Sequence, residues 1–184
     1  MIPRLSLAAA AIALGACAST AAAAPETPVE PEAAQPAPAT ASATILGTAG
    51  QEIGTAQLTD APHGLMVRVE LAPGSLTPGW HGIHFHAVGD CSDVGMYKMS
   101  GGHVGKMDGG HGLFNPEGPE AGDLPNIWAA ADGSAGYEAF TTLDTVESLT
   151  DADGSAIIIH EAPDDGITQP IGGAGARVAC GVVS

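Results

Sequence analysis

The stretch GLMVRVEL at residues 64–71 decides the fold class of this chain. Every second side chain from Leu65 to Leu71 is apolar and would share one face, whereas Arg68 and Glu70 would point to the other. This period of two is typical of a half-buried antiparallel strand, with one face on the core and one in water.

The same pattern recurs along the chain, between turn signals such as Asp132-Gly133 and Asp153-Gly154. Further runs occur at 44–48, 52–59, 80–88, 126–131, 136–142, 155–160 and 176–183. About eight short strands without a convincing helix predict an all-β protein, an antiparallel β-sandwich or flattened barrel. The stretch 89–125 has no strand pattern and is rich in Gly, and a loop of that length inside a domain is usually functional.

Composition limits the partners that the protein can bind. The 184 residues include 5 Lys+Arg and 21 Asp+Glu, which gives a formal net charge of −16. Nucleic acids and anionic lipids are bound through basic patches, so we exclude both as partners. The chain also has 26 Gly and 14 Pro but only 4% aromatic residues, which favours a loop-rich β protein.

The N-terminus has the pattern of an export signal. Arg4 supplies a positive charge, and the apolar stretch from Leu5 to Leu14 is too short to span a bilayer. The end of this stretch, Leu14-Gly15-Ala16-Cys17, is similar to the lipobox of bacterial lipoproteins, with residues 1–16 as the signal peptide and Cys17 as the lipidated residue. Ordinary signal cleavage at the same small residues is the alternative. The lipoprotein interpretation predicts a protein exported to the periplasm and held at a membrane only by its lipid.

Residues 17–42 are predicted to be a tether between this signal and the folded domain. They are rich in Ala, Pro, Thr, Ser and Glu, and prolines at 25, 28, 31, 36 and 38 rule out a regular helix. The folded domain is therefore expected to cover residues 43–184.

The histidines carry the chemical information. His84 and His86 lie two residues apart in a predicted strand, so both rings would point to one face and could reach one metal ion. Two exposed strand histidines are the alternative. Metal binding is favoured because the long loop carries His103 and His111, and His160 ends a β-branched strand.

Several motifs together identify a family resemblance. They are His81-Gly82-x-His84-x-His86, Gly101-Gly102-His103, Gly122-Asp123-Leu124-Pro125, Ile159-His160-Glu161 and the tail from Gly173 to Val182. From about residue 44 to the end, the chain resembles the copper/zinc superoxide dismutase family in its bacterial, exported form. The resemblance implies a Greek-key β-sandwich and the conversion of superoxide to dioxygen and hydrogen peroxide.

The resemblance also assigns metal ligands. It implies copper ligands at His84, His86, His103 and His160, and zinc ligands at His103, His111 and Asp123. His103 would bridge the two metals and take up a proton during turnover, which gives it a catalytic role. Four imidazole nitrogens suit copper, and nitrogen with carboxylate oxygen suits zinc. Copper can exchange an electron with superoxide, whereas zinc has no redox chemistry.

Four further assignments follow from the resemblance. Asp164 would link a copper histidine to a zinc histidine, and Arg177 would attract the superoxide anion. Cys91 and Cys180 would form the family disulfide, which persists in an oxidising compartment. His81 would be structural, and His63, which matches nothing in the family, is interpreted as a surface residue.

The chain departs from the family pattern at one zinc position. Where the family has a third zinc histidine, this sequence has Glu120. A Glu oxygen can ligate zinc, so an altered site is one hypothesis. The other is that Glu120 faces solvent and zinc binds weakly or not at all. Lys98 and Lys106, in the long loop, are candidates for guiding the substrate anion in place of a charged guidance loop.

We therefore predict a superoxide dismutase, with a non-catalytic copper-binding lipoprotein for metal buffering or delivery as the alternative. Arg177 favours the enzyme, because metal storage does not need it. A hydrolase is excluded because no nucleophile lies in a recognisable motif. The sequence leaves the oligomeric state open, with a homodimer as one candidate.

Overall fold

The structure is a computed structural model that describes residues 37–105 and 110–184. The predicted signal peptide, Cys17, most of the predicted tether and Lys106 lie outside the described residues. Within the described part, no helix is long and apolar enough to cross a membrane.

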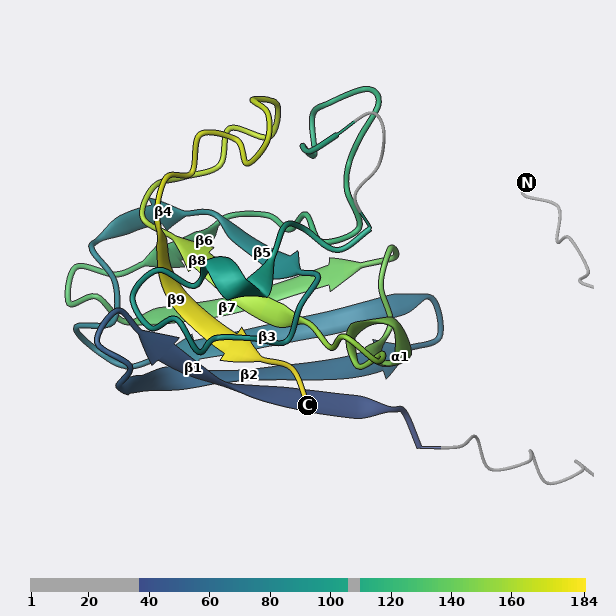
Figure 1. The fold of residues 1–184 in the computed structure, drawn as a ribbon, viewed down its shortest axis with the longest axis horizontal. Helices are drawn as coiled ribbons and strands as arrows, with labels where there is room; N and C mark the ends of the chain where they lie inside the picture. The colour runs from purple at the N-terminus through teal and green to yellow at the C-terminus, as the bar shows by residue number, and fades with distance from the viewer. Residues whose placement is uncertain (1–36, 106–109) are drawn as a thin grey trace, which may run out of the picture. The chain divides into compact units, whose positions relative to one another are not determined.

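Nine antiparallel strands form one sheet that curls into a nearly closed barrel (Figure 1). They are β1 (Thr40–Gly47), β2 (Glu52–Ala61), β3 (Gly64–Leu71), β4 (Gly79–His81), β5 (Ile83–His86), β6 (Ile127–Ala129), β7 (Ala135–Thr141), β8 (Ala156–His160) and β9 (Arg177–Val182). Their order is β4-β6-β7-β3-β2-β1-β9-β8-β5. The non-consecutive neighbours β3–β7 and β1–β9 mark the crossovers of a Greek key. The predicted all-β fold class is confirmed, and residues 40–42, expected in the tether, belong to β1.

The ninth strand arises because the predicted strand at 80–88 divides at Gly82. β4 pairs with β6, whereas β5 pairs with β8. Gly82 lies in the break: its N–H donates to the Ala162 carbonyl at 2.9 Å, and its carbonyl accepts from His160 N–H at 2.8 Å. A Cβ at this position would lie only 2.9 Å from the Cβ of Ala174, so the close approach requires glycine.

The alternation in β3 produces the expected core face. Leu65, Val67 and Val69 are fully buried, whereas Arg68 and Glu70 are exposed. Each such aliphatic side chain contributes about 1.5–3 kcal/mol when removed from water. The largest fully buried core residues also include Ile45, Leu58, Ile83, Phe85, Leu124, Ile127, Leu149, Ile157 and Ile159.

Two short helical turns correct the expectation of a chain without helix. They are the α-helix α1 (Val146–Leu149) and the 3₁₀-helix η1 (Lys98–Ser100), which lies in the long loop. Thr145 caps α1 by accepting Ser148 N–H at 3.1 Å. A single turn is too short to show a helical period, so sequence patterning does not reveal it.

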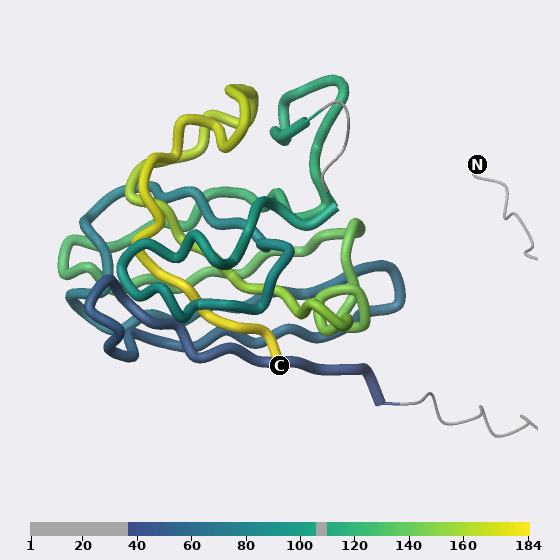
Figure 2. Tube along the Cα trace, viewed as in Figure 1, coloured from purple at the N-terminus to yellow at the C-terminus, as the bar shows by residue number. Residues whose placement is uncertain are grey.

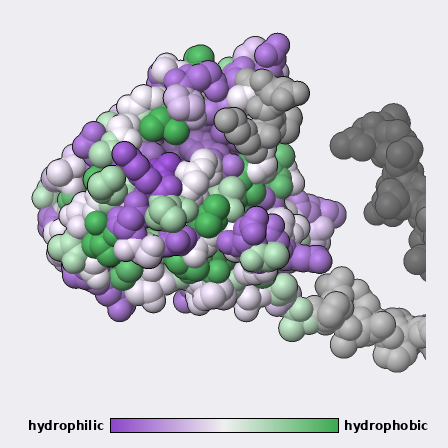
Figure 3. All heavy atoms as spheres, viewed as in Figure 1, coloured by the Kyte–Doolittle hydropathy of each residue, from purple (hydrophilic) through white to green (hydrophobic). Residues whose placement is uncertain are grey.

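Two long connections rise from the same end of the barrel (Figures 1 and 2). One is the later part of the long loop between β5 and β6, and the other joins β8 to β9. On the face in Figure 3, hydrophobic residues are interspersed with hydrophilic ones. The two connections bring together the residues described next.

Candidate metal centre

The four histidines that the resemblance assigns to copper converge on one point. β5 carries His84 and His86, β8 ends at His160, and His103 comes from the long loop, where it forms a β-bridge with His86. One nitrogen of each ring lies within 4.8 Å of the others, and all four residues are buried. We call His84, His86, Nε2 of His103 and His160 the copper half of the site.

The converging nitrogens have no hydrogen-bond partner among the described residues. They are His84 Nδ1, His86 Nε2, His103 Nε2 and His160 Nε2. The other nitrogen of each ring is hydrogen-bonded: His84 Nε2 to Asp164 Oδ2 at 2.7 Å, His86 Nδ1 to Gly101 O at 2.9 Å, His103 Nδ1 to Asp123 Oδ1 at 2.9 Å and His160 Nδ1 to Gly175 O at 3.1 Å. These bonds fix each ring with one nitrogen toward the centre. Buried polar atoms without partners are costly, and four imidazole donors fit copper.

Burial keeps three rings of the copper half, those of His84, His86 and His160, neutral. Burial, and after it the nearby positive charge of Arg177, lower the pKa of His86 to about 2. Burial likewise lowers the pKa of His160 to about 3 and lowers that of His84. Their lone pairs are therefore available near neutral pH without the loss of a proton.

Asp123 is the centre of the predicted zinc site. Its Oδ1 accepts hydrogen bonds from His103 Nδ1 at 2.9 Å and from His111 Nδ1 at 2.7 Å. Its Oδ2 accepts the backbone N–H groups of Gly112 at 2.8 Å and of Glu120 at 3.0 Å. His103, His111 and Asp123 also belong, together with His84, to a second group of buried donors that lie within 4.8 Å of one another. This set of nitrogen and oxygen donors fits zinc.

Glu120 does not face solvent. The residue is only 4% exposed, and its Oε2 lies 2.9 Å from His103 Nδ1. The hypothesis of a solvent-facing Glu120 is therefore wrong about its position, although Glu120 lies outside the second group of donors. We call Nδ1 of His103, His111, Asp123 and Glu120 the zinc half of the site.

The zinc half is held together by charge. Burial alone would lower the pKa of His111, but hydrogen bonds to Asp123 and Asp164 raise it to about 10. Burial alone would raise the pKa values of Asp123 and Asp164. The hydrogen bonds that these carboxylates accept from histidines lower both pKa values below their usual range instead. A charged ring is thus paired with two carboxylates.

Asp164 connects the two halves as the resemblance implies. It accepts from His84 Nε2 at 2.7 Å and from His111 Nε2 at 3.1 Å. Its backbone is held in turn by Asn126, whose Nδ2 donates to Asp164 O at 2.8 Å and whose Oδ1 accepts Asp164 N–H at 2.9 Å.

A second amide side chain holds a zinc-half residue in the same way. Gln169 Oε1 accepts the backbone N–H of His111 at 2.9 Å, and its Nε2 donates to His111 O at 2.7 Å. Sequence reasoning missed both Asn126 and Gln169, because an isolated Asn or Gln gives no local pattern that marks such a contact.

Arg177 lies half-buried at the start of β9. It donates from Nη1 to Tyr97 O at 2.6 Å and from Nη2 to Gly101 O at 2.7 Å. A cavity of about 490 Å³ adjoins it, lined by Gly95, Met96, Lys98, Gly175, Ala176 and Arg177. Among the described residues, the third Arg or Lys besides Lys98 and Arg177 is Arg68, which forms an ion pair with Glu138. Two cations therefore line one cavity.

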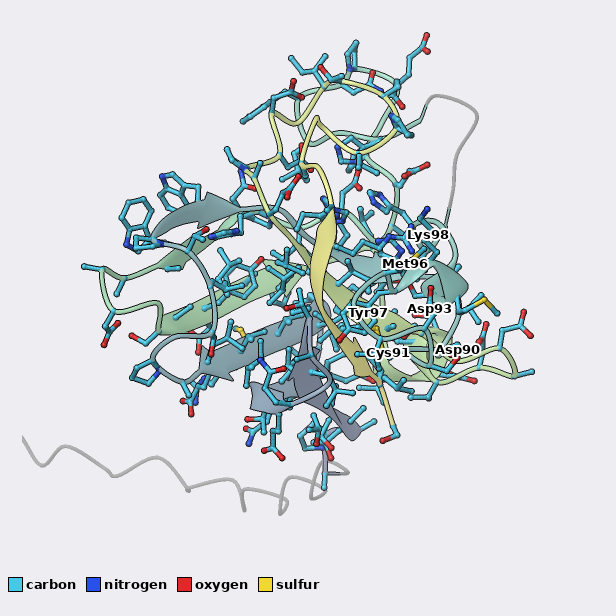
Figure 4. All side chains as sticks on the ribbon, turned by 60° about the vertical axis from the view of Figure 1, so that its left-hand side comes forward. Asp90, Cys91, Asp93, Met96, Tyr97 and Lys98 are labelled. Atoms are coloured by element: carbon cyan, nitrogen blue, oxygen red, sulfur yellow. A yellow bond between two sulfur atoms is a disulfide. The ribbon has the colours of Figure 1, made fainter. Side chains whose placement is uncertain are left out.

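A disulfide ties the long loop to the last strand. Cys91 and Cys180 are bonded across 89 residues of sequence, with Cα atoms 5.9 Å apart. Tyr97, fully buried, packs in the same apolar cluster. Figure 4 shows Cys91, Asp93, Tyr97 and Lys98 gathered beside β9. The disulfide therefore lies next to the segment that contacts Arg177.

The two remaining described histidines are not in the metal centre. His81 is buried, and its ring nitrogens bond to His160 O and Thr77 O, each at 2.7 Å. His63 is exposed in the turn between β2 and β3. Both positions agree with the structural and surface roles expected for them.

The fold and the site define a β-barrel metalloprotein with two overlapping groups of metal donors, which have His84 and His103 in common. The profile of the family copper/zinc superoxide dismutase (SODC) matches residues 52–183. The chain belongs to the copper/zinc superoxide dismutase family, a family of oxidoreductases. Membership of this family and the two groups of donors make copper and zinc the metals of the site.

Individual relatives agree with this assignment. The superoxide dismutase [Cu-Zn] of Caulobacter vibrioides is 48% identical over 150 residues, which cover 78% of this chain and 84% of that protein. The structure of the Cu/Zn superoxide dismutase from Brucella abortus matches with a TM-score of 0.67 and 28% identity, covering 79% of this chain and 100% of that chain. A superoxide dismutase-like protein from Bacillus subtilis matches with a TM-score of 0.68 and 33% identity, covering 77% and 96%.

Proposed function

We propose that the protein is a superoxide dismutase that holds copper at His84, His86, His103 and His160. The observation that carries the proposal is the convergence, near an anchored arginine, of four imidazole nitrogens that have no hydrogen-bond partner among the described residues. Copper bound there supplies a centre that accepts an electron from one superoxide and returns it to the next. Two superoxide anions and two protons give one dioxygen and one hydrogen peroxide.

The chain's own residues attract the anion and supply a proton. Arg177 places a fixed positive charge beside the cavity, where it can hold a small anion. His103 has Nε2 toward the copper half and Nδ1 toward the zinc half. A proton can therefore be held at Nε2 and passed to the peroxide that the second superoxide becomes.

The test is the rate of superoxide decay with copper- and zinc-loaded protein. We expect Arg177→Ala to reduce the second-order rate constant by about 10- to 100-fold, because a preorganised charge at the substrate is lost. A wild-type rate no better than that of the same amount of free copper would contradict the proposal. It would leave the non-catalytic copper-binding lipoprotein as the better description.

We further propose that Glu120 is a zinc ligand, together with His103, His111 and Asp123. Its burial and its distance of 2.9 Å from His103 Nδ1 support this role. Glu120→Ala should then weaken zinc binding in a chelator competition, and Glu120→His should retain tight binding. Equal zinc affinity in Glu120→Ala and the wild type would contradict the assignment.

Lys98 is proposed to guide superoxide toward Arg177, since both line the same cavity. On a protein with a net charge of −16, local cations must attract the substrate anion. Lys98→Gln should lower the rate at low salt and reduce its ionic-strength dependence. The same role is proposed for Lys106, which lies outside the described residues. If the variant with both Lys98→Gln and Lys106→Gln kept the wild-type salt dependence, neither lysine would have this role.

From the sequence we also propose an exported lipoprotein, cleaved after residue 16 and lipidated at Cys17. The N-terminal pattern supports this proposal. Cys17→Ser should abolish labelling by a radioactive fatty acid and release the protein from membranes. Sedimentation of the released protein would then measure whether it forms a homodimer.

A further inference from the structure

The hydroxyl of Ser100 lies between Arg177 and a histidine of the copper half. Ser100 is fully buried at the end of η1. Its Oγ accepts from Arg177 Nη1 at 3.0 Å, donates to Tyr97 O at 2.8 Å and lies 3.3 Å from His86 Nδ1. One hydroxyl therefore contacts both the anion-attracting residue and a predicted copper ligand.

Ser100 completes the attachment of one end of the guanidinium. The two N–H groups of Nη1 donate to Tyr97 O and Ser100 Oγ, and one N–H group of Nη2 donates to Gly101 O. A guanidinium has five N–H groups. Within the described part of the chain, no acceptor is found for Nε–H or for the second Nη2–H of Arg177, so these donors are available to an anion.

The segment that carries Ser100 is itself fixed. Tyr97 has φ 52° and ψ 27°, the left-handed conformation that only this non-glycine residue adopts among the described residues. The Asp93 carboxylate accepts the N–H groups of Lys98 at 2.8 Å and Met99 at 3.2 Å. The Tyr97 hydroxyl donates to the carbonyl of Gly47 on β1. An unusual backbone held at several points is consistent with a functional constraint on this turn.

We propose that Ser100 is a positioning residue that orients Arg177, so that the remaining N–H groups of the guanidinium stay available to a small anion. The proposal rests on the proposed function, in which Arg177 is the anion-attracting group. Without the Ser100 hydroxyl, one Nη1–H loses its acceptor and the guanidinium can turn. Its donors are then less well preorganised for the anion.

The test measures azide affinity by titration of the copper- and zinc-loaded protein, followed by the Cu(II) absorption spectrum. Ser100→Ala should raise the dissociation constant about three- to tenfold, which corresponds to the net value of one ordinary hydrogen bond. Ser100→Cys, similar in size but a weak acceptor, should behave like Ser100→Ala. Ser155→Ala is the matched control, because Ser155 is equally buried and donates to Leu149 O, outside the metal centre. It should leave the azide affinity unchanged.

A double-mutant cycle separates positioning from general structure. If Ser100 acts through Arg177, Ser100→Ala should have no effect on azide affinity in an Arg177→Ala background. An equal loss in both backgrounds, or no loss in the wild-type background, would overturn the proposal. If Arg177→Ala itself leaves azide affinity unchanged, the role of Arg177 fails, whereas failure of Ser100→Ala alone removes only this inference.

Discussion

The donors of the copper half have no hydrogen-bond partners for their converging nitrogens among the described residues, whereas the donors of the zinc half hydrogen-bond to one another. Burial makes the rings of His84, His86 and His160 in the copper half neutral, while His111 in the zinc half is charged and paired with carboxylates. The comparison shows two ways to keep metal ligands in place. One uses a rigid frame that tolerates unsatisfied atoms, and the other uses mutual attraction between the ligands.

The two halves also differ in the part of the backbone that carries their ligands. Three of the four copper-half rings come from β5 and β8, which pair along their length from Ile83–Ile159 to His86–Ala156. The zinc half comes from the long loop, which Asp164 and Gln169 fasten to the connection between β8 and β9. Sheet pairing therefore positions most of the copper half, and side-chain contacts position the zinc half.

The largest expected effect is the loss of Asp123. Asp123→Asn keeps the shape but removes the charge that pairs with His111, so we expect the metal-stripped protein to lose about 3–5 kcal/mol of unfolding free energy. Zinc affinity should fall as well, because a ligand is lost. Denaturant unfolding after treatment with a chelator measures the first effect, and chelator competition measures the second.

The matched variant in the copper half is His160→Asn. The Asn amide can retain the bond to Gly175 O, while Nε2, which has no partner among the described residues, is removed. The metal-stripped protein should therefore lose less than about 2 kcal/mol. Copper binding should nevertheless be lost. Equal destabilisation by His160→Asn and Asp123→Asn would show that the two halves do not differ in the way described.

The disulfide gives the next largest effect and tests whether it supports the segment that contacts Arg177 rather than the zinc half. Replacing both Cys91 and Cys180 by Ser opens a link across 89 residues and should cost about 2–4 kcal/mol of unfolding free energy. Because the bond lies beside the segment that contacts Arg177, azide affinity should also fall, while zinc affinity should stay the same. A loss of zinc with unchanged azide affinity would contradict this division.

Gln169→Ala should have a smaller effect, confined to the zinc half. The variant loses two hydrogen bonds to the backbone of His111, which we expect to cost about 1–2 kcal/mol and to weaken zinc binding about tenfold. Gln57→Ala, at an exposed position of β2, is the control and should change neither quantity. An effect on copper affinity as large as that on zinc affinity would contradict the assignment of Gln169 to the zinc half.

The sequence predicts the fold well where burial repeats locally. The alternation in β3 marks its buried face residue by residue, because each side chain faces either core or water. The break at Gly82 could not be predicted, since the alternation continues through it and only the change of partner strand separates β4 from β5.

The site shows the same limit. Spacing and family motifs predict the histidines and Asp123 as metal ligands, because these residue types have little other reason to recur at such positions. The burial of Glu120 and the contacts of Asn126, Gln169 and Ser100 could not be predicted from the sequence. These contacts join segments far apart in the chain and depend on how the loops pack.

Asp144 gives the smallest expected effect. It extends the comparison with the copper half, because it is a buried group whose charge a proton can remove. Its Oδ2 has no partner in the described part of the chain, and burial raises its pKa to about 6, despite a hydrogen bond from Ser148. The folded state therefore binds more protons than the unfolded state between about pH 4 and 6, so stability should fall as the pH rises through this range. Asp144→Asn removes the titration and should add about 1 kcal/mol above pH 6 and nothing below pH 4, the gain being limited because the amide also lacks a full set of partners. Unfolding by urea at pH 4, 5, 6 and 7.5 measures the difference, and an equal effect of Asp144→Asn at every pH would show that the carboxyl does not titrate in this way.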